Sequence, residues 1–176
     1  MLAQIGKSPA AGDAVDLLLD CHERIRAFLA LARRVAEAGP SEPGLGEAAA
    51  RVRRYFVEAL PLHARDEEES IAPRLRGRDP VVDAELAAMV REHGEHERPL
   101  SALVAACEAI AGAPVLAPAV AGDLARAVVE LERHFAGHLG REESIVFPAM
   151  RRLLDRADDA AIVREIRARR AGTGRA

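Results

Sequence analysis

The sequence contains little cysteine, few aromatic residues and no long apolar run. Its two cysteines, Cys21 and Cys107, stand far apart without paired spacing, so neither a disulfide framework nor a thiolate zinc site is indicated. Tryptophan is absent and aromatic residues make up 3% of the chain, which disfavours a strand-rich fold. No segment has the ~20 apolar residues that would span a bilayer, and no apolar run follows a basic start. We therefore expect a cytoplasmic protein that has no membrane partner.

The chain also lacks a strong charge of either sign. Its 25 Lys and Arg residues nearly balance its 28 Asp and Glu residues, and the formal net charge is -3. Such a balance gives the whole molecule no field that would attract nucleic acid, so no nucleic-acid partner is expected. Only residues 164–175 are locally basic, and we interpret them as a solvated helix end or a frayed terminus.

The residues that are abundant favour helices. Ala, Leu, Arg and Glu dominate, and 176 residues is the size of one ordinary domain. Gly and Pro divide the chain into helical patterns at about 14–38, 47–76, 80–111, 119–154 and 158–170. The short connection at 77–79 favours an antiparallel hairpin. We predict an all-α protein with a tail over 1–12, an up-down antiparallel four-helix bundle over 13–156, and a short C-terminal helix with a basic tail over 157–176.

Prolines and acidic residues mark the expected shape of these helices. Asp13 and Asp79 stand where N-caps are expected. Four prolines fall inside the helical patterns, and each removes a backbone donor and crowds the preceding turn. We therefore expect kinks or local bulges at Pro61, Pro73, Pro99 and Pro148.

A motif of the form His-x-x-x-Glu-Glu, closed by a proline, occurs twice. It begins at His63 and again at His138, with the same internal spacing. Each half of the chain also carries an earlier His beside an acidic residue, His22 in the first half and His93 in the second. This internal repeat predicts two helix pairs that bring four such elements around one axis.

All six histidines fall in the four long predicted helices. Residues four apart share a helix face, so His63 lies over Glu67 and His138 lies over Glu142. A glutamate on a core-facing stripe is costly to bury unless a positive partner neutralises it, and no Lys or Arg stands there at ligand spacing. We therefore infer a buried metal site. The mixture of imidazole and carboxylate favours iron or manganese, and zinc remains an alternative.

These residues resemble the haemerythrin-like domains that carry the HHE cation-binding pattern. The resemblance covers about residues 13–154, through a lone His on the first helix, His-x-x-x-Glu on the second, Glu-His on the third and His-x-x-x-Glu on the fourth. In that family these positions bind two irons that the carboxylates bridge. The resemblance therefore implies a haemerythrin-like fold and two iron ions held by His22, His63, Glu67, His93, His138 and Glu142.

The sequence departs from the oxygen-carrying members at one position of the third helix. Those members have a second His where Glu97 stands here. We favour His134, one turn before His138, as the additional ligand or as a partner of a ligand, ahead of His96 and Glu97. Adjacent to the ligand glutamates, Glu68 is interpreted as a solvated residue or a partner of a ligand, and Glu143 likewise. Cys21 is interpreted as a small core residue.

Three functions fit these observations, and the sequence does not decide whether the protein is an enzyme. The resemblance implies reversible binding or sensing of dioxygen, nitric oxide or a related oxidant by a monomer or homodimer, with Phe56, Met89 and Leu131 keeping water from the bound ligand. The first alternative is a di-iron protein that reduces peroxide or nitric oxide, stores iron or repairs iron-sulfur centres. The second is a metal-free helical interaction domain, which predicts no bound metal.

Overall fold

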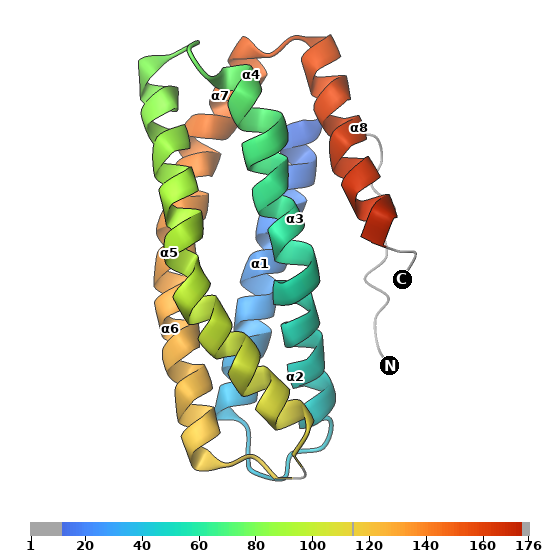
Figure 1. Ribbon diagram of the computed structural model, residues 1–176, viewed down its shortest axis with the longest axis vertical. Helices are drawn as coiled ribbons and strands as arrows, with labels where there is room; N and C mark the ends of the chain where they lie inside the picture. Colours follow the sequence, from blue (N-terminus) through green and yellow to red (C-terminus); the bar gives the residue numbers. More distant parts are fainter. Residues whose placement is uncertain (1–11, 114, 174–176) are drawn as a thin grey trace.

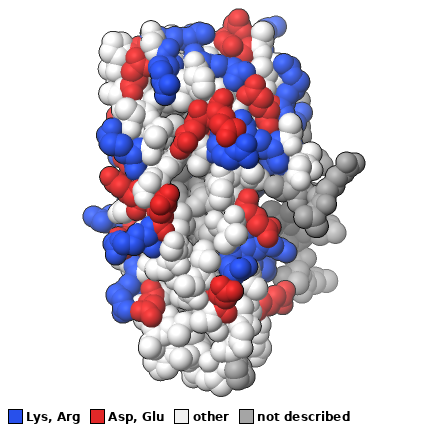
Figure 2. All heavy atoms as spheres, viewed as in Figure 1, with Lys and Arg blue, Asp and Glu red and all other residues white. Residues whose placement is uncertain are grey.

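The computed structural model describes residues 12–113 and 115–173, and within them every element is helical. The predicted tail over 1–12 lies almost wholly outside the described residues. Figure 1 shows a long bundle with a further helix against its side, and Figure 2 shows acidic and basic side chains intermixed over the same face. Where η denotes a π-helical turn, the elements are α1 (Ala14–Glu37), α2 (Leu45–Arg54), η1 (Tyr55–Ala59), α3 (Leu60–Arg65), η2 (Asp66–Ile71), α4 (Ala72–Leu75), α5 (Pro80–Ala111), α6 (Pro118–Arg141), η3 (Glu142–Val146), α7 (Phe147–Leu153) and α8 (Arg156–Thr173).

Four rods make the bundle, as predicted. They are α1, the run from α2 to α4, then α5, and the run from α6 to α7. α1 packs against α2 and α6, and α5 packs against the same two helices, so α1 and α5 lie on one diagonal. The all-α four-helix architecture expected from the sequence is confirmed. No described helix is both long enough and apolar enough to cross a membrane.

The ends of α1 and α5 follow from the capping residues. Asp13 accepts a hydrogen bond from the backbone N–H of Asp16 at 2.8 Å, and the Asp16 carboxylate accepts one from Asp13 in return. Asp79 accepts from the N–H of Val81 at 2.9 Å at the start of α5. Gly77 has a φ of 78°, a conformation that favours glycine, in the tight turn before that cap. The predicted hairpin between the second and third rods therefore forms.

Three of the four internal prolines follow a π-helical turn. Proline lacks the N–H of an α-helical bond and its ring crowds the carbonyl four residues earlier, and a wider turn relieves that crowding. In each case the residue before the proline donates to the carbonyl five residues back: Leu60 to Tyr55, Ala72 to Glu67, and Phe147 to Glu142. The expected bulges are confirmed at Pro61, Pro73 and Pro148. Pro99 lies within the unbroken helix α5, which changes direction partway along (Figure 1).

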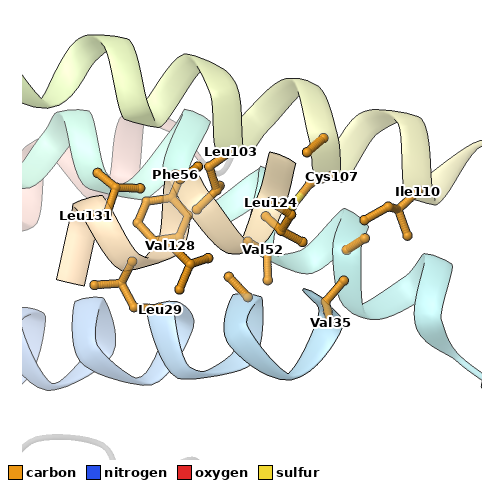
Figure 3. Close-up of a cluster of buried hydrophobic side chains, with 14 of the residues drawn as sticks. Leu29, Val35, Val52, Phe56, Leu103, Cys107, Ile110, Leu124, Val128 and Leu131 are labelled. Atoms are coloured by element: carbon orange, nitrogen blue, oxygen red, sulfur yellow. The ribbon is translucent and has the colours of Figure 1, made fainter. Parts of the chain in front are cut away.

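The apolar core consists of two clusters at different heights of the bundle. The larger one joins buried side chains of α1, α2, η1, α3, α5 and α6, and the residues labelled in Figure 3, including Leu29, Phe56 and Leu131, point toward one another. The second contains Leu18, Met89 and other side chains of α1, α4, α5, α7 and α8. Along each rod the histidines and glutamates of the repeat stand between residues of the two clusters. The fold therefore sandwiches a polar layer between two apolar ones.

The C-terminal helix α8 is attached to the bundle by ion pairs that the sequence did not indicate. Arg169 pairs with Asp66 at 2.8 Å, and Arg170 pairs with the same carboxylate at 2.6 Å. Asp66 is fully buried, at 0% exposure, so these contacts attach α8 to the bundle beside η2. The interpretation of residues 164–175 as a solvated or frayed end is wrong for Arg169 and Arg170, because both side chains pair with the buried Asp66. The sequence did not indicate this pairing, since Asp66 lies about 100 residues earlier in the chain.

Asp66→Ala is expected to destabilise the metal-free protein by about 3–5 kcal/mol, because it leaves two partly buried guanidiniums without their carboxylate. Urea unfolding of the metal-free chain measures this change. Glu69→Ala is the matched control: Glu69 contacts Arg65 and Arg169 from the same π turn but is 47% exposed, so its loss should destabilise the chain much less than the loss of Asp66. Equal effects of the two substitutions would contradict this role of Asp66.

Candidate metal centre

Six of the side chains predicted as ligands converge in the polar layer. They come from all four rods, and the two glutamates stand at the beginning of the equivalent π turns η2 and η3. Five of them are buried, and His93 is partly exposed. They form two groups that share both glutamates: a first group of His22, His63, Glu67 and Glu142, and a second group of Glu67, His93, His138 and Glu142.

In the first group, two histidine nitrogens face two carboxylate oxygens. His22 Nε2 lies 3.2 Å from Glu142 Oε2, and His63 Nε2 lies 3.0 Å from Glu67 Oε1. The rings of His22 and His63 meet edge to face with their centroids 5.1 Å apart. One potential ligand atom from each of the four residues lies within 4.8 Å of the others, which is close enough for a single ion to contact all four.

The second group repeats this arrangement on the other oxygens of the same carboxylates. His93 Nε2 lies 3.1 Å from Glu67 Oε2, and His138 Nε2 lies 3.2 Å from Glu142 Oε1. The His93 and His138 rings also meet edge to face, at 5.1 Å. Each glutamate therefore presents one oxygen to the first group and one to the second, the arrangement of a carboxylate that bridges two ions.

The contacts between the glutamate oxygens and the histidine nitrogens do not satisfy the hydrogen-bonding capacity of these atoms. Both oxygens of Glu67 and both oxygens of Glu142 are buried and lack a hydrogen-bond partner among the described residues, and so does His22 Nε2. Buried carboxylate oxygens almost always have a partner, since leaving one unpaired is costly. The histidine nitrogens and glutamate oxygens approach to 3.0–3.2 Å without hydrogen-bond geometry. Bound cations between them would accept their lone pairs and so satisfy these atoms. These residues therefore fit bound metal cations.

The charges in the layer support the same conclusion. Burial disfavours ionised groups here, yet the Glu67 carboxylate raises the pKa of His63 well above its ordinary value, and His63 lowers the pKa of Glu67 well below its own. Burial and the neighbouring charge of Glu67 raise the pKa of Glu142. Contacts with Glu67 and Glu68 outweigh burial and raise the pKa of His93 to about 9. Two carboxylates confined to an apolar layer thus depend on positive charge between them.

Three of the four histidines are oriented by an outer carboxylate. In each case Nδ1–H donates to a glutamate, which leaves Nε2 to face the centre; this arrangement fixes the tautomer and the direction of a metal-binding imidazole. The pairs are His22 with Glu143 at 2.8 Å, His93 with Glu68 at 2.6 Å, and His138 with Glu92 at 2.9 Å. The sequence left open whether Glu68 and Glu143 are solvated or contact a histidine, and in the structure both contact a histidine. The role of Glu92 was missed, because its partner lies on another helix, although its position next to His93 is a signal that it lies near the centre.

Glu92→Gln is expected to weaken metal binding at the second group by about 10–100-fold. The neutral amide would orient the His138 ring less strongly and would make its Nε2 less basic, and therefore a weaker metal ligand. Zinc titration in competition with a chromophoric chelator measures this affinity. Glu130→Gln is the matched control, since Glu130 lies on the adjacent helix α6 and pairs with Arg98 rather than with a histidine. An unchanged second affinity in the Glu92 variant would contradict the proposed orientation.

His63 is the exception among the four histidines. Its Nδ1 has no hydrogen-bond partner among the described side chains, and its neighbour from α1 is the thiol of Cys21. Arg170 of α8 donates to Cys21 Sγ at 3.4 Å. Although burial opposes it, His63 and then Arg170 lower the pKa of this thiol. Cys21 is buried as predicted, but it also contacts the centre, so the first group differs from the second in its surroundings.

The structure does not bring His134 to either group. Its ring is partly buried, and Nε2 lies 3.2 Å from the Arg133 guanidinium. His96 stands closer to the centre: its ring lies 5.2 Å from that of His138 and 4.5 Å from that of Phe135. Burial and the neighbouring histidines lower the pKa of His96 to about 4, which keeps the ring neutral. The ligand role of His134 stays a prediction, and Glu97 is exposed and lies outside both groups.

Comparison with known families agrees with this centre. The family described as the Hemerythrin HHE cation binding domain matches residues 13–117, which is more than half of the chain. No curated protein matches the sequence. The matched range includes His22, His63, Glu67 and His93, and the fold adds His138 and Glu142 to the same centre. The chain therefore belongs to the haemerythrin family of HHE cation-binding domains, with a His/Glu cluster able to hold metal.

Proposed function

We propose that the two groups bind two iron ions and that the bound centre takes up a small oxidising ligand such as dioxygen or nitric oxide. The observation that carries the proposal is the unpartnered state of all four oxygens of Glu67 and Glu142. Iron accepts both imidazole and carboxylate ligands, and the two-His, carboxylate-rich donor set of each group is typical of non-haem iron. Manganese and zinc are the alternatives that elemental analysis distinguishes. The proposed ligands are His22, His63, Glu67, His93, His138 and Glu142.

The protein side chains position this centre and leave space at it. Each group offers four donor atoms, fewer than the six of an octahedral site, so a small ligand can add to it. Two adjacent irons supply paired one-electron chemistry when they are bound. Glu67 and Glu142 hold the two positions together, and the outer glutamates fix three of the four imidazoles. The apolar clusters above and below the layer exclude bulk water from a bound ligand.

Anaerobic loading with ferrous iron, followed by exposure to dioxygen or nitric oxide, tests the proposal. We expect a discrete adduct with charge-transfer absorption, which disappears when the gas is removed under vacuum. The same spectra should be absent from protein loaded with zinc, because zinc has no redox chemistry. Simple oxidation of the iron without a reversible adduct would contradict ligand binding, and a chain that takes up no iron would contradict the metal assignment.

A further inference from the structure

A cavity of about 510 Å³ lies beside the second group, between α3 and α5. Its lining includes the buried or partly buried rings of His93, His96 and His138, with His63 of the first group, and its rim includes exposed residues such as Val90 and Gly94. The remaining wall is mainly apolar, with Phe56, Leu60, Leu100 and Phe135 among its side chains. We call this space the α3–α5 cavity. It joins the solvent to the second group.

The exposure of the ligands indicates that access to the centre is from this side. The His93 side chain is 15% exposed, whereas the side chains of His22 and His138 are 0% and 2% exposed. Among the histidines of the two groups that line the α3–α5 cavity, His93 is therefore the most exposed. The first group has no comparable exposure of its histidines, because His63 is also buried.

The cavity is far larger than a diatomic ligand needs. A water molecule occupies about 30 Å³ of liquid, and a diatomic gas is of similar size, so 510 Å³ exceeds that need more than tenfold. Cavities of roughly 300–1,000 Å³ with mostly apolar walls and a few polar groups are typical of sites for small organic molecules. The size and lining therefore point to an organic ligand with a hydrocarbon part.

His96 is a polar side chain that such a ligand could contact in the cavity. The His96 side chain is buried, at 3% exposure, and lines the cavity. Its contacts within residues 12–113 and 115–173 are ring contacts to His93, His134, Phe135 and His138, and none of the described residues forms a hydrogen bond with it. The ring therefore has no hydrogen-bond partner among the described residues, and it can offer a nitrogen to a ligand in the cavity. A ligand that ends in an O–H group at this point would satisfy it.

The charge of the rim argues against an anionic ligand. Glu68 and Glu97 both line the cavity, and Glu97 forms no ion pair with any described residue. Arg65, the arginine of the rim, already pairs with Glu69 at 2.8 Å, and Glu68 pairs with His93 at 2.6 Å. A carboxylate at the mouth would therefore meet the uncompensated charge of Glu97, whereas a neutral molecule would not be repelled.

We propose that the α3–α5 cavity binds a neutral organic hydroperoxide, with its hydrocarbon part against Phe56 and Phe135 and its O–O–H end at His96 and the second group. This proposal rests on the proposed function, since the oxidising end is directed to a bound metal ion. Among neutral molecules, a hydroperoxide combines an apolar body with a terminal O–H that the His96 ring can accept and an oxygen that can approach a metal.

Zinc-loaded protein tests the binding, because zinc neither reduces the probe nor obscures nuclear magnetic resonance signals. Cumene hydroperoxide is the probe, and we expect nuclear Overhauser contacts between its ring protons and those of Phe56 and Phe135. Cumate, an anion of similar shape, should bind at least about tenfold more weakly because of the acidic rim. Saturable binding without contacts to these two rings, or equal binding of the anion, would overturn the proposal.

Two matched substitutions locate the probe. Gly94 lines the cavity and an added side chain meets no atom within 4 Å at its first carbon, so Gly94→Phe should fit the helix and fill the mouth, weakening the probe at least about tenfold. Gly140→Phe is the control, because Gly140 is equally open but lies outside the cavity lining. Unchanged probe affinity in the Gly94 variant would overturn the proposal. A chain that binds no metal would overturn the proposed function and this proposal with it, whereas two bound ions without probe binding would overturn this proposal alone.

Discussion

Glu67→Gln is expected to reduce the metal content of the purified protein from about two ions per chain to fewer than about half an ion. Glu67 places Oε1 at the first group and Oε2 at the second, so a single substitution affects both positions. The amide keeps the shape of the side chain but carries no charge, and it can offer only one good acceptor atom. Elemental analysis after anaerobic iron loading measures the loss.

Two further variants control this experiment. Glu142→Gln should have the same effect, because Glu142 also places one oxygen at each group. Glu69→Gln should retain both ions, since Glu69 stands in the same π turn as Glu67 but points to Arg65 and Arg169. Circular dichroism would establish that each variant is folded. Full metal content in the Glu67 variant would show that this carboxylate does not bridge two ions.

Removal of the metal is expected to lower the thermal midpoint of unfolding by about 15–30 °C. An ion present at 1,000 times its dissociation constant stabilises the folded chain by about 4 kcal/mol, and two ions by about 8 kcal/mol. For a chain of this size, 1 kcal/mol corresponds to about 2–4 °C. Calorimetry before and after dialysis against a chelator measures the change.

The chelator itself can be controlled with the same Glu67→Gln protein. Because that variant is expected to bind little metal, dialysis against chelator should change its thermal midpoint of unfolding by less than about 3 °C. Restoration of the wild-type midpoint on adding iron back would complete the cycle. A wild-type midpoint that does not change when the metal is removed would contradict a structural contribution of the two ions.

The sequence predicted the architecture and the inner side chains because both follow from short-range periodicity. Helical spacing alone places His63 over Glu67 and His138 over Glu142, and the pairs stand so in the structure. Capping residues likewise predicted where α1 and α5 begin. Prolines predicted the position of three bulges, although not that each bulge would be a π turn.

Contacts between helices could not be predicted in the same way. Spacing along one helix does not determine which partner faces it, so the pairing of Glu92 with His138 and the attachment of α8 through Asp66 appear only in the fold. The same limit explains the choice between His134 and His96. His96 lies on α5 against Phe135 and lines the α3–α5 cavity, whereas His134 lies on α6 beside Arg133, and these contacts appear only in the fold.

The most direct test is the number of iron ions that the intact chain binds when it is loaded anaerobically with ferrous iron and freed of excess metal, with Mössbauer spectroscopy to report whether they are coupled. We expect two ions per chain in one bridged centre, because each of the two glutamates turns one oxygen toward each histidine pair. A folded chain that retains no iron, or that holds a single isolated ion, would contradict this expectation.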